Sequence, residues 1–212
     1  MQHAVYSLAG ASLIAAMAFL TLGAANAASE TDATNETLKS PEAFKTISDR
    51  SERSVALFNE MGKVIAHPRC MNCHPKGDSP LQGMNMQKHE PPVVRGAGGM
   101  GAPAMRCSTC HGAENVPYTD GEGSIPGHAV WRLAPPEQAW VGKSLGEICR
   151  QLKDQKRSHM TLAELQEHNA TDGLVGWGWN PGEGRIPVPG SQKVFGELTQ
   201  AWIETGAECP EV

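Results

Sequence analysis

The sequence predicts a mainly helical fold with long irregular loops rich in glycine and proline, and three observations support this class. Apolar residues recur at helical spacing in several segments, and two of these segments begin with a capping box. The chain contains 23 glycines and 15 prolines, which favour turns and irregular connections. Aromatic residues make up only 5% of the chain, so we expect a large apolar cofactor to complete a modest core of side chains.

The N-terminal segment has the features of an export signal. Residues 1–29 contain no Lys, Arg, Asp or Glu, and residues 8–22 form a short apolar stretch. Ala25-Asn26-Ala27 has the small-x-small pattern that signal peptidase recognises, so we expect residues 1–27 to be a signal peptide. An uncleaved membrane anchor is the alternative, because the uncharged stretch is just long enough to span a bilayer. We favour cleavage, which predicts a periplasmic protein that is not attached to the membrane.

The mature chain begins with residues 28–40, a polar segment that we expect to be flexible. Residues 41–212 are expected to form a single domain. Ser40 and Pro41 predict the start of a helix, because they supply a cap and a proline at the first helical position. Apolar residues follow at helical spacing, namely Phe44, Ile47, Val55, Phe58, Met61 and Ile65.

Three further helices are predicted nearer the C-terminus. Capping boxes at residues 144–147 and 161–164 predict where two of them begin. The last helix is expected from about residue 191 to residue 205, with Gly206 as its stop. In contrast, residues 76–105 are rich in Gly and Pro and show no sustained periodicity, which predicts a long loop.

The sequence Cys-x-x-Cys-His occurs twice, at residues 70–74 and 107–111. In such a run, two thiols on one helical turn can reach the vinyl groups of a haem, and the adjacent histidine can bind the iron. Two Cys-x-x-Cys pairs that bind zinc are usually about 15–20 residues apart, whereas 33 residues separate Cys73 from Cys107. Neither zinc nor a pair of disulfides accounts for the matching histidines. The sequence therefore predicts two haem c groups, with thioethers to Cys70, Cys73, Cys107 and Cys110 and with iron ligands His74 and His111.

The two runs begin only 37 residues apart, at Cys70 and Cys107. This spacing leaves too little chain for two tandem cytochrome domains of ordinary size. We therefore expect one compact dihaem cytochrome c unit, with the two haems close together.

Cys149 and Cys209 are the remaining cysteines, and neither is followed by histidine. In an exported protein they are expected to form a disulfide, which would close a loop of about 60 residues. Two buried free thiols are the alternative.

Each iron also needs a second axial ligand, and we predict His89 and His168. His89 lies in the loop 15 residues after His74, so we pair it with the haem of that histidine. His168 points inward from its predicted helix, and we pair it with the haem of His111. The alternatives that stay open are His67, bound to the haem of the other run, and the methionines Met84, Met86, Met100, Met105 and Met160. Clustered methionines also suit Cu(I), but haem explains the same loop more simply.

The charge distribution indicates which partners are possible. The chain has a formal net charge of −5, but residues 61–111 carry a local charge of +4 and the rest carries −9. The local basic residues can neutralise haem propionates, or they can form a docking face for an acidic redox partner. An acidic, exported chain does not suggest nucleic acid as a partner.

Five segments carry a resemblance to a known family, namely "HPRCMNCHPKGDSPLQG", "HEPPVVRG", "MRCSTCHG", "LVGWGWNPGEGRIPVPGSQ" and "AWIETGAECP". Together they resemble small exported bacterial dihaem cytochromes, often described as cytochrome subunits of isoquinoline 1-oxidoreductase-type dehydrogenases. The resemblance covers about His67 to Pro210. It implies electron transfer between a periplasmic dehydrogenase, or another donor, and a downstream acceptor. His67, His89 and His168 match its pattern, which favours His89 and His168 as ligands.

Two classes of function fit these features. An electron carrier would have two six-coordinate irons and no substrate pocket. A haem enzyme, for instance a peroxidase, would keep one iron open to substrate. We find no acid–base constellation beyond the histidines already assigned, so we expect a carrier with no catalytic residue. A zinc-binding module is the third possibility.

Overall fold

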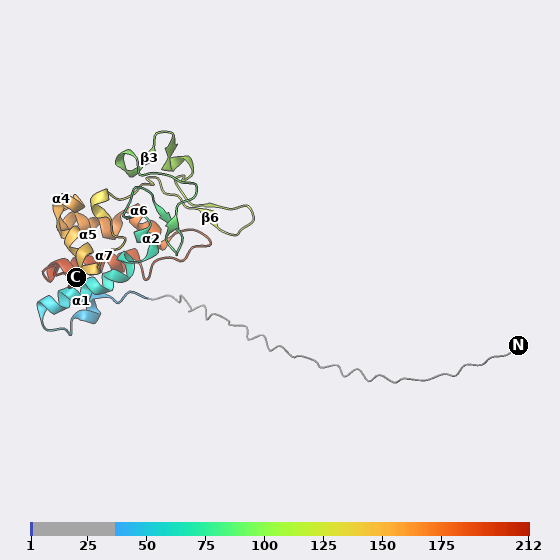
Figure 1. Cartoon of the computed structure of the whole chain (residues 1–212). Helices are drawn as coiled ribbons and strands as arrows, with labels where there is room; N and C mark the ends of the chain where they lie inside the picture. The colour runs from blue at the N-terminus through green and yellow to red at the C-terminus, as the bar shows by residue number, and fades with distance from the viewer. Residues whose placement is uncertain (2–36) are drawn as a thin grey trace. The chain divides into compact units, whose positions relative to one another are not determined.

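The computed structural model describes Met1 and residues 37–212 (Figure 1). The expected signal peptide, and the expected flexible segment up to residue 36, lie outside the described residues. Within residues 37–212 helices dominate and each strand is two residues long, which confirms the mainly helical class. None of the helices in this part of the chain is long enough and apolar enough to cross a bilayer.

The helical elements follow one another along the chain with irregular connections between them. They are η1 (Pro41–Phe44), α1 (Arg50–Ile65), α2 (Pro68–Met71), η2 (Ala97–Gly99), η3 (Cys107–Thr109), η4 (Pro136–Gln138), α3 (Leu145–Lys153), α4 (Gln155–Ser158), α5 (Leu162–Thr171), α6 (Gly173–Gly176), η5 (Trp177–Trp179) and α7 (Gln192–Glu204).

The helix expected from Pro41 is in fact two elements. The short η1 begins at Pro41, and α1 begins separately after Asp49, whose carboxylate accepts a hydrogen bond from the Glu52 amide at 2.8 Å. A second cap inside the periodic stretch restarts the helix there, so apolar spacing alone did not reveal the break. Just before η1, Leu38 is buried and the Lys39 amide bonds the Glu60 carboxylate. The last residues of the segment expected to be flexible are therefore held against α1.

The capping boxes predicted for two of the other long helices are present, and so is the predicted stop of the last helix. Ser144 and Thr161 each form a reciprocal capping box with the glutamate three residues later, at the starts of α3 and α5. Ser191 caps α7, and Gly206 follows that helix with a φ of 114°, which glycine adopts without strain. The sequence thus predicted these helix boundaries closely.

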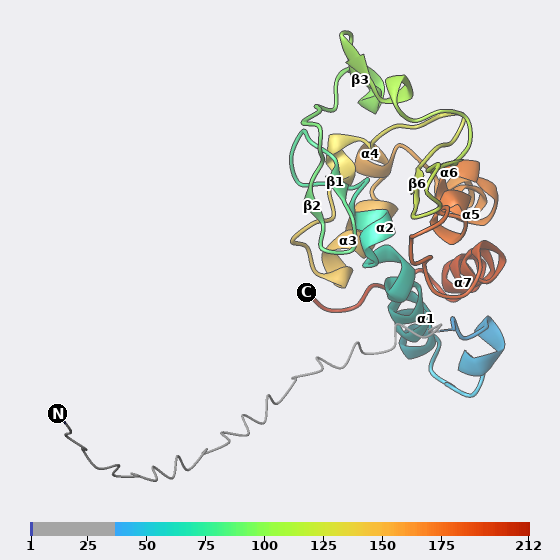
Figure 2. The same cartoon turned by 90° about the vertical axis from the view of Figure 1, so that its right-hand side faces the viewer.

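The core lies where α7 packs between α1 and α5 (Figure 2). Phe58 of α1 and Trp202 of α7 are fully buried, and their ring centroids are 5.0 Å apart. Buried aliphatic side chains of α3 and α5 join the same cluster. The expected disulfide between Cys149 and Cys209 is formed, and it ties α3 to the C-terminal segment after α7. Apolar packing and one covalent bond therefore hold the helical part together.

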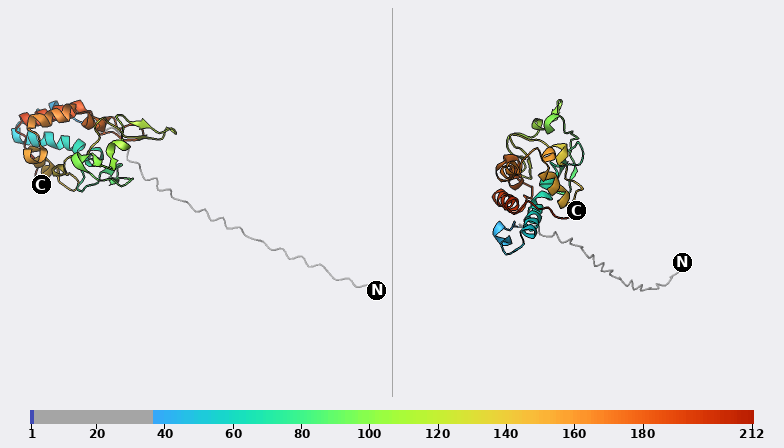
Figure 3. Two further views of the ribbon diagram at one scale, coloured as in Figure 1. Left: turned by 90° about the horizontal axis from the view of Figure 1, so that it is seen from above. Right: turned by 90° about the vertical axis from the view of Figure 1, so that its left-hand side faces the viewer.

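Three small antiparallel hairpins lie outside this core. In Figure 1 the labelled strands β3 and β6 lie on the opposite side from α1, and the left-hand view of Figure 3 shows one hairpin projecting from the rest. They pair β1 (Leu81–Gln82) with β2 (Gln87–Lys88), β3 (Gly101–Ala102) with β4 (Met105–Arg106), and β5 (Val116–Pro117) with β6 (Ser124–Ile125). The segment expected to be a loop thus contains one complete hairpin and one strand of another. Both are too short to show a period-2 pattern in the sequence.

Candidate functional site

The first Cys-x-x-Cys-His run forms a helical turn that continues from α2. Pro68 occupies the first position of α2, directly after His67, which is its N-cap. The amides of Cys73 and His74 both donate to the carbonyl of Cys70, at 3.1 and 3.2 Å. The turn therefore holds two thiols and an imidazole within one short stretch of backbone.

The second run has a matching backbone turn at η3. The amides of Cys110 and His111 donate to the carbonyl of Cys107, at 3.2 and 2.9 Å. The four cysteines of the two runs are free thiols, so the disulfide alternative does not hold for them. Both runs therefore present the same set of groups, in the arrangement that the repeated motif predicts.

A cavity of about 830 Å³ adjoins the first run. Its volume lies within the range of pockets for small molecules and cofactors. Cys70, Cys73 and His74 line it, and so does His168 of α5. Several of its remaining walls are core side chains, namely Val64, Ile65, Leu133, Leu152, Leu165 and Phe195. The core is thus incomplete beside the first run, and a largely apolar group of suitable size would complete it.

The first run is the more deeply enclosed of the two. Burial raises the pKa of the Cys70 thiol to about 12 and that of Cys73 to about 11, with Cys107 as a second cause at Cys73. The pKa of Cys107 is also raised by burial, while Cys110 is exposed. The Cys107 thiol lies 3.8 Å from the carbonyl oxygen of Gly99, and Gly99 lines the same cavity as Cys70 and Cys73, so the two runs lie close together in space.

The imidazoles of the two runs share one hydrogen-bonding arrangement. His74 Nδ1 is 2.8 Å from the carbonyl oxygen of Gln138, and His111 Nδ1 is 2.7 Å from that of Pro126. A carbonyl can only accept, so each Nδ1 carries the proton and each Nε2 has a free lone pair. Burial lowers the pKa of His74 to about 3 and also lowers that of His111, which favours the neutral rings. Both rings are thus prepared to bind a metal through Nε2.

A tryptophan stacks on each of these rings. The ring centroids of His74 and Trp140 are 3.4 Å apart with an interplanar angle of 11°, and those of His111 and Trp131 are 4.7 Å apart at 13°. Trp140 is itself held by a hydrogen bond from its Nε1 to Gln138. Our sequence reading missed both tryptophans because they lie in an irregular segment. The one available signal was the presence of two of the five tryptophans in a stretch with no helical or strand pattern.

His89 lies beside His111, with their ring centroids 6.0 Å apart and their planes at 62°. A metal ion about 2 Å from one nitrogen of each ring would separate two such centroids by about 6 Å. His89 Nδ1 is 2.9 Å from the carbonyl oxygen of Pro91, so its Nε2 is also free to bind. The pair therefore has a separation suited to one shared metal ion.

His168 borders the cavity of the first run together with His74. It lies one turn after the buried Leu165 on α5, so it faces the same way, as the sequence predicted. Its Nδ1 is 3.5 Å from a carboxylate oxygen of Asp172, and this contact leaves Nε2 free. His168 is also close enough to contribute to the lowered pKa of His74.

The structure does not favour the expected pairing of the two candidate distal histidines. The sequence pairs His89 with the haem of His74, and His168 with the haem of His111, whereas the ring of His89 lies beside that of His111, and His168 lines the same cavity as His74. A separation of 15 residues limits how far His89 can lie from His74, but it does not determine the direction in which the chain leaves.

Two groups of residues can now be defined. The first site consists of Cys70, Cys73, His74 and His168. The second site consists of Cys107, Cys110, His111 and His89.

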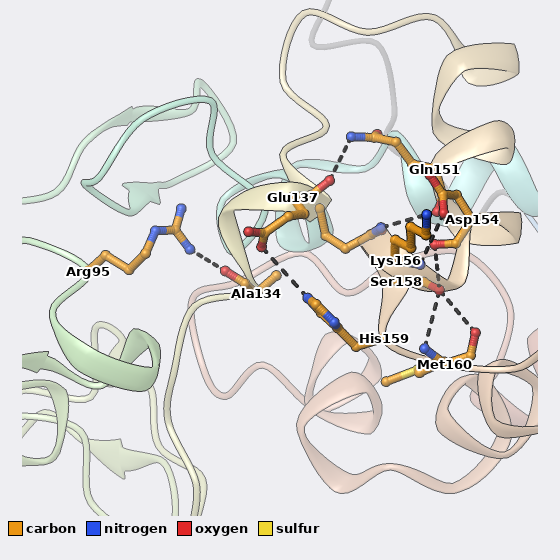
Figure 4. Close-up of polar contacts among 10 residues, drawn as sticks. Arg95, Ala134, Glu137, Gln151, Asp154, Lys156, Ser158, His159 and Met160 are labelled. Atoms are coloured by element: carbon orange, nitrogen blue, oxygen red, sulfur yellow. Dashed lines mark hydrogen bonds and ion pairs between the residues drawn. The ribbon is translucent and has the colours of Figure 1, made fainter.

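The other histidines near the cavity have different partners. His67 Nδ1 accepts from the Arg69 amide at 3.1 Å, and His128 Nδ1 accepts from the Val130 amide at 3.2 Å, so in both neutral rings the proton is on Nε2. His159 directs Nε2 toward the Glu137 carboxylate at 3.8 Å (Figure 4). None of these three has the arrangement seen in His74, His111, His89 and His168.

The methionines proposed as competing ligands differ in their position relative to the cavity. Met160 lines the cavity of the first site and is the methionine that can compete with His168 there. The others are exposed on the loop and hairpins between the two runs, namely Met84, Met86, Met100 and Met105. Their exposure offers no enclosed thioether cluster for Cu(I).

Buried arginines supply positive charge at the wall of the cavity. Arg69 is 8% exposed and donates through Nε to the carbonyl of Ile186 at 2.9 Å, but it has no carboxylate partner among residues 37–212. Arg95 is 7% exposed, donates to the carbonyls of Ala134 and Gly77, the former shown in Figure 4, and lies 3.5 Å from the Asp78 carboxylate, so it already has a charged partner. Buried charges in proteins are normally paired. An anionic group of a ligand in the cavity would provide the missing partner of Arg69.

No protein-family model matches the chain, and no curated protein or solved structure is detectably similar to it. Among the described residues, no group of three or more His, Cys, Asp or Glu side chains is arranged to hold a metal ion by itself. What the structure does offer is a largely apolar cavity lined by two thiols and two imidazoles, with Arg69, which has no carboxylate partner among residues 37–212, in its wall. These features fit haem c, whose iron takes its axial ligands from the protein and whose propionates are anionic.

Proposed function

We propose that the chain is an exported c-type cytochrome that binds two haem c groups and transfers electrons. Thioethers to the two cysteines of each run would hold the haems. His74 and His168 would be the axial ligands at the first site, and His111 and His89 those at the second. The observation that carries the proposal is the shared state of these four imidazoles, each with Nδ1 engaged and Nε2 free.

When bound, haem supplies a one-electron iron couple, and the residues of the chain determine what that couple can do. With one histidine from each run and one from elsewhere as ligands, both axial positions of each iron would be filled and no position would be left for a substrate. The tryptophans on His74 and His111 restrict the rotation of those rings. This arrangement favours an electron carrier over a peroxidase-like enzyme, which needs one open axial position.

The proposed location is the periplasm. The N-terminal signal would direct the chain there and would then be cleaved off. The disulfide between Cys149 and Cys209 supports an oxidising compartment. The proposed partners are redox proteins, among them a periplasmic dehydrogenase as donor, in keeping with the family that the sequence resembles.

Haem attachment is tested on the full chain matured with the cytochrome c assembly machinery. The mature protein should carry the mass of two haems, and acid–acetone extraction should remove neither, because thioethers are covalent. Replacing both cysteines of one run with serine should remove one haem. As the matched control, replacing Cys149 and Cys209 with serine should remove none. Extraction of a haem from the intact chain, or zinc in place of iron, would contradict the proposal.

A further inference from the structure

Asp172 makes contacts with both of its carboxylate oxygens. Its Oδ1 accepts from the amides of Leu174 at 2.8 Å and Val175 at 3.0 Å, as the N-cap of α6. Its Oδ2 lies 3.5 Å from Nδ1 of His168. Its backbone carbonyl accepts from Gln192 at 2.8 Å, which fixes the residue against α7. The carboxylate is thus held in one orientation by groups other than the histidine it contacts.

This charged partner distinguishes His168 from the other three candidate ligands. His74, His111 and His89 each place Nδ1 against a neutral backbone carbonyl. A carboxylate at Nδ1 makes an imidazole a stronger donor to a metal than a carbonyl does. Arg132 also acts on His168 and opposes this effect, but its influence is smaller than that of Asp172.

We propose that Asp172 is a positioning residue that orients His168 and lowers the reduction potential of the first site. The inference rests on the proposed function and goes one step beyond it. A more strongly donating axial ligand favours the oxidised over the reduced iron. Among residues 37–212, no carboxylate contacts His89 or His111, whose Nδ1 atoms lie against carbonyls, so the contact with Asp172 shifts the distribution of electrons toward the second site.

The test is a potentiometric titration of the mature dihaem protein and of Asp172→Asn. Asparagine is as good an N-cap as aspartate, so the variant should keep α6 while losing the negative charge. We expect the oxidised-to-reduced equilibrium of one haem to change at least tenfold toward reduction, which is about 59 mV for one electron. The other haem should not change. His168→Met should raise the potential of the same haem, which assigns the shift to the first site.

Asp154→Asn is the matched control. Asp154 also caps a four-residue helix, α4, through an acceptor bond from the Lys156 amide, and it contacts none of the four candidate ligands. Its substitution should leave both potentials unchanged.

A second variant, Asp172→Ser, keeps a capping group that is too short to reach His168. It should raise the same potential and should also broaden the electron paramagnetic resonance signal of that haem, because the ring is no longer held in one orientation. Two low-spin haems with unchanged potentials in both Asp172 variants would overturn the inference and leave the proposed function intact. Failure of the wild-type protein to bind haem would overturn the proposed function itself.

Discussion

At the scale of single residues, the candidate ligands differ from the other histidines in which ring nitrogen carries the proton. The lone pair of Nε2 is free in His89 and His168, while His67 and His128 use Nδ1 as the acceptor. Sequence position could not have shown this difference, since it depends on which backbone group each ring meets.

His168→Ala should leave one of the two irons high-spin, or bound to an exogenous ligand, without loss of covalent haem. The reason is that His168 lines the same cavity as His74 and is the proposed second ligand there. Absorption spectra of the oxidised protein measure the change. His67→Ala, the control, should show two low-spin haems, because its Nδ1 is an acceptor. An unchanged low-spin spectrum in His168→Ala would show that His168 is not an iron ligand and only packs against its neighbours.

His67 should also make stability depend on pH. Burial, with a smaller effect of Arg69, lowers the pKa of His67 to about 4 in the folded protein, from 6.5. Between these values the unfolded chain binds more protons, so the free energy of unfolding decreases as the pH falls from 6.5 toward 4.

This dependence is measured by denaturant unfolding across that pH range, for the wild type and for His67→Asn. Asparagine can retain the N-cap of α2, so the comparison isolates the titration. The variant should lose less stability on acidification. Equal losses in the two proteins would show that His67 does not contribute.

At the scale of elements, α5 connects a local sequence signal to the first site. Its capping box at Thr161 is the same device as the box at Ser144 on α3, but α5 carries His168 and α3 carries no candidate ligand. The two helices thus form a natural comparison between a cap that supports the site and one that does not.

Thr161→Ala and Ser144→Ala should each lower the free energy of unfolding by about 1 kcal/mol, since each removes one cap. Only Thr161→Ala should also make His168 easier to displace. We expect cyanide to bind one haem about fivefold more readily in that variant, as measured by absorption titration. Equal cyanide binding in the two variants would mean that the start of α5 does not support His168.

At the scale of the whole molecule, the disulfide is the one covalent link within the described chain between distant segments. It joins α3 to the segment after α7, across 60 residues, and it lies on the helical core rather than at either site. Its role should therefore be stability rather than redox chemistry.

Replacing Cys149 and Cys209 together with serine should lower the free energy of unfolding by at most about 4 kcal/mol, from the loop-closure entropy of the unfolded chain. Denaturant unfolding of the dihaem protein gives this value. The haem spectra should stay as in the wild type, which serves as the control for an intact fold. A change in either haem spectrum would show that the disulfide affects a proposed haem site, which its position on the helical core does not predict.

Much of this molecule could be predicted because the relevant signals are local. The boxes at Ser144 and Thr161, the stop at Gly206 and the repeated Cys-x-x-Cys-His turns each depend on interactions within a few residues. The break before α1 was missed because a second cap at Asp49 interrupts an otherwise continuous apolar pattern.

By itself, the sequence determined the helical class, the disulfide and the list of candidate ligands. The tertiary structure decided which of these candidates lie near each other: the ring of His89 lies beside that of His111, and His168 lines the same cavity as His74. It also decided which tryptophans stack on the rings and which carboxylate contacts His168. The physical reason is that ring pairs and charge pairs depend on how distant segments pack together, whereas motifs and caps depend on neighbours along the chain.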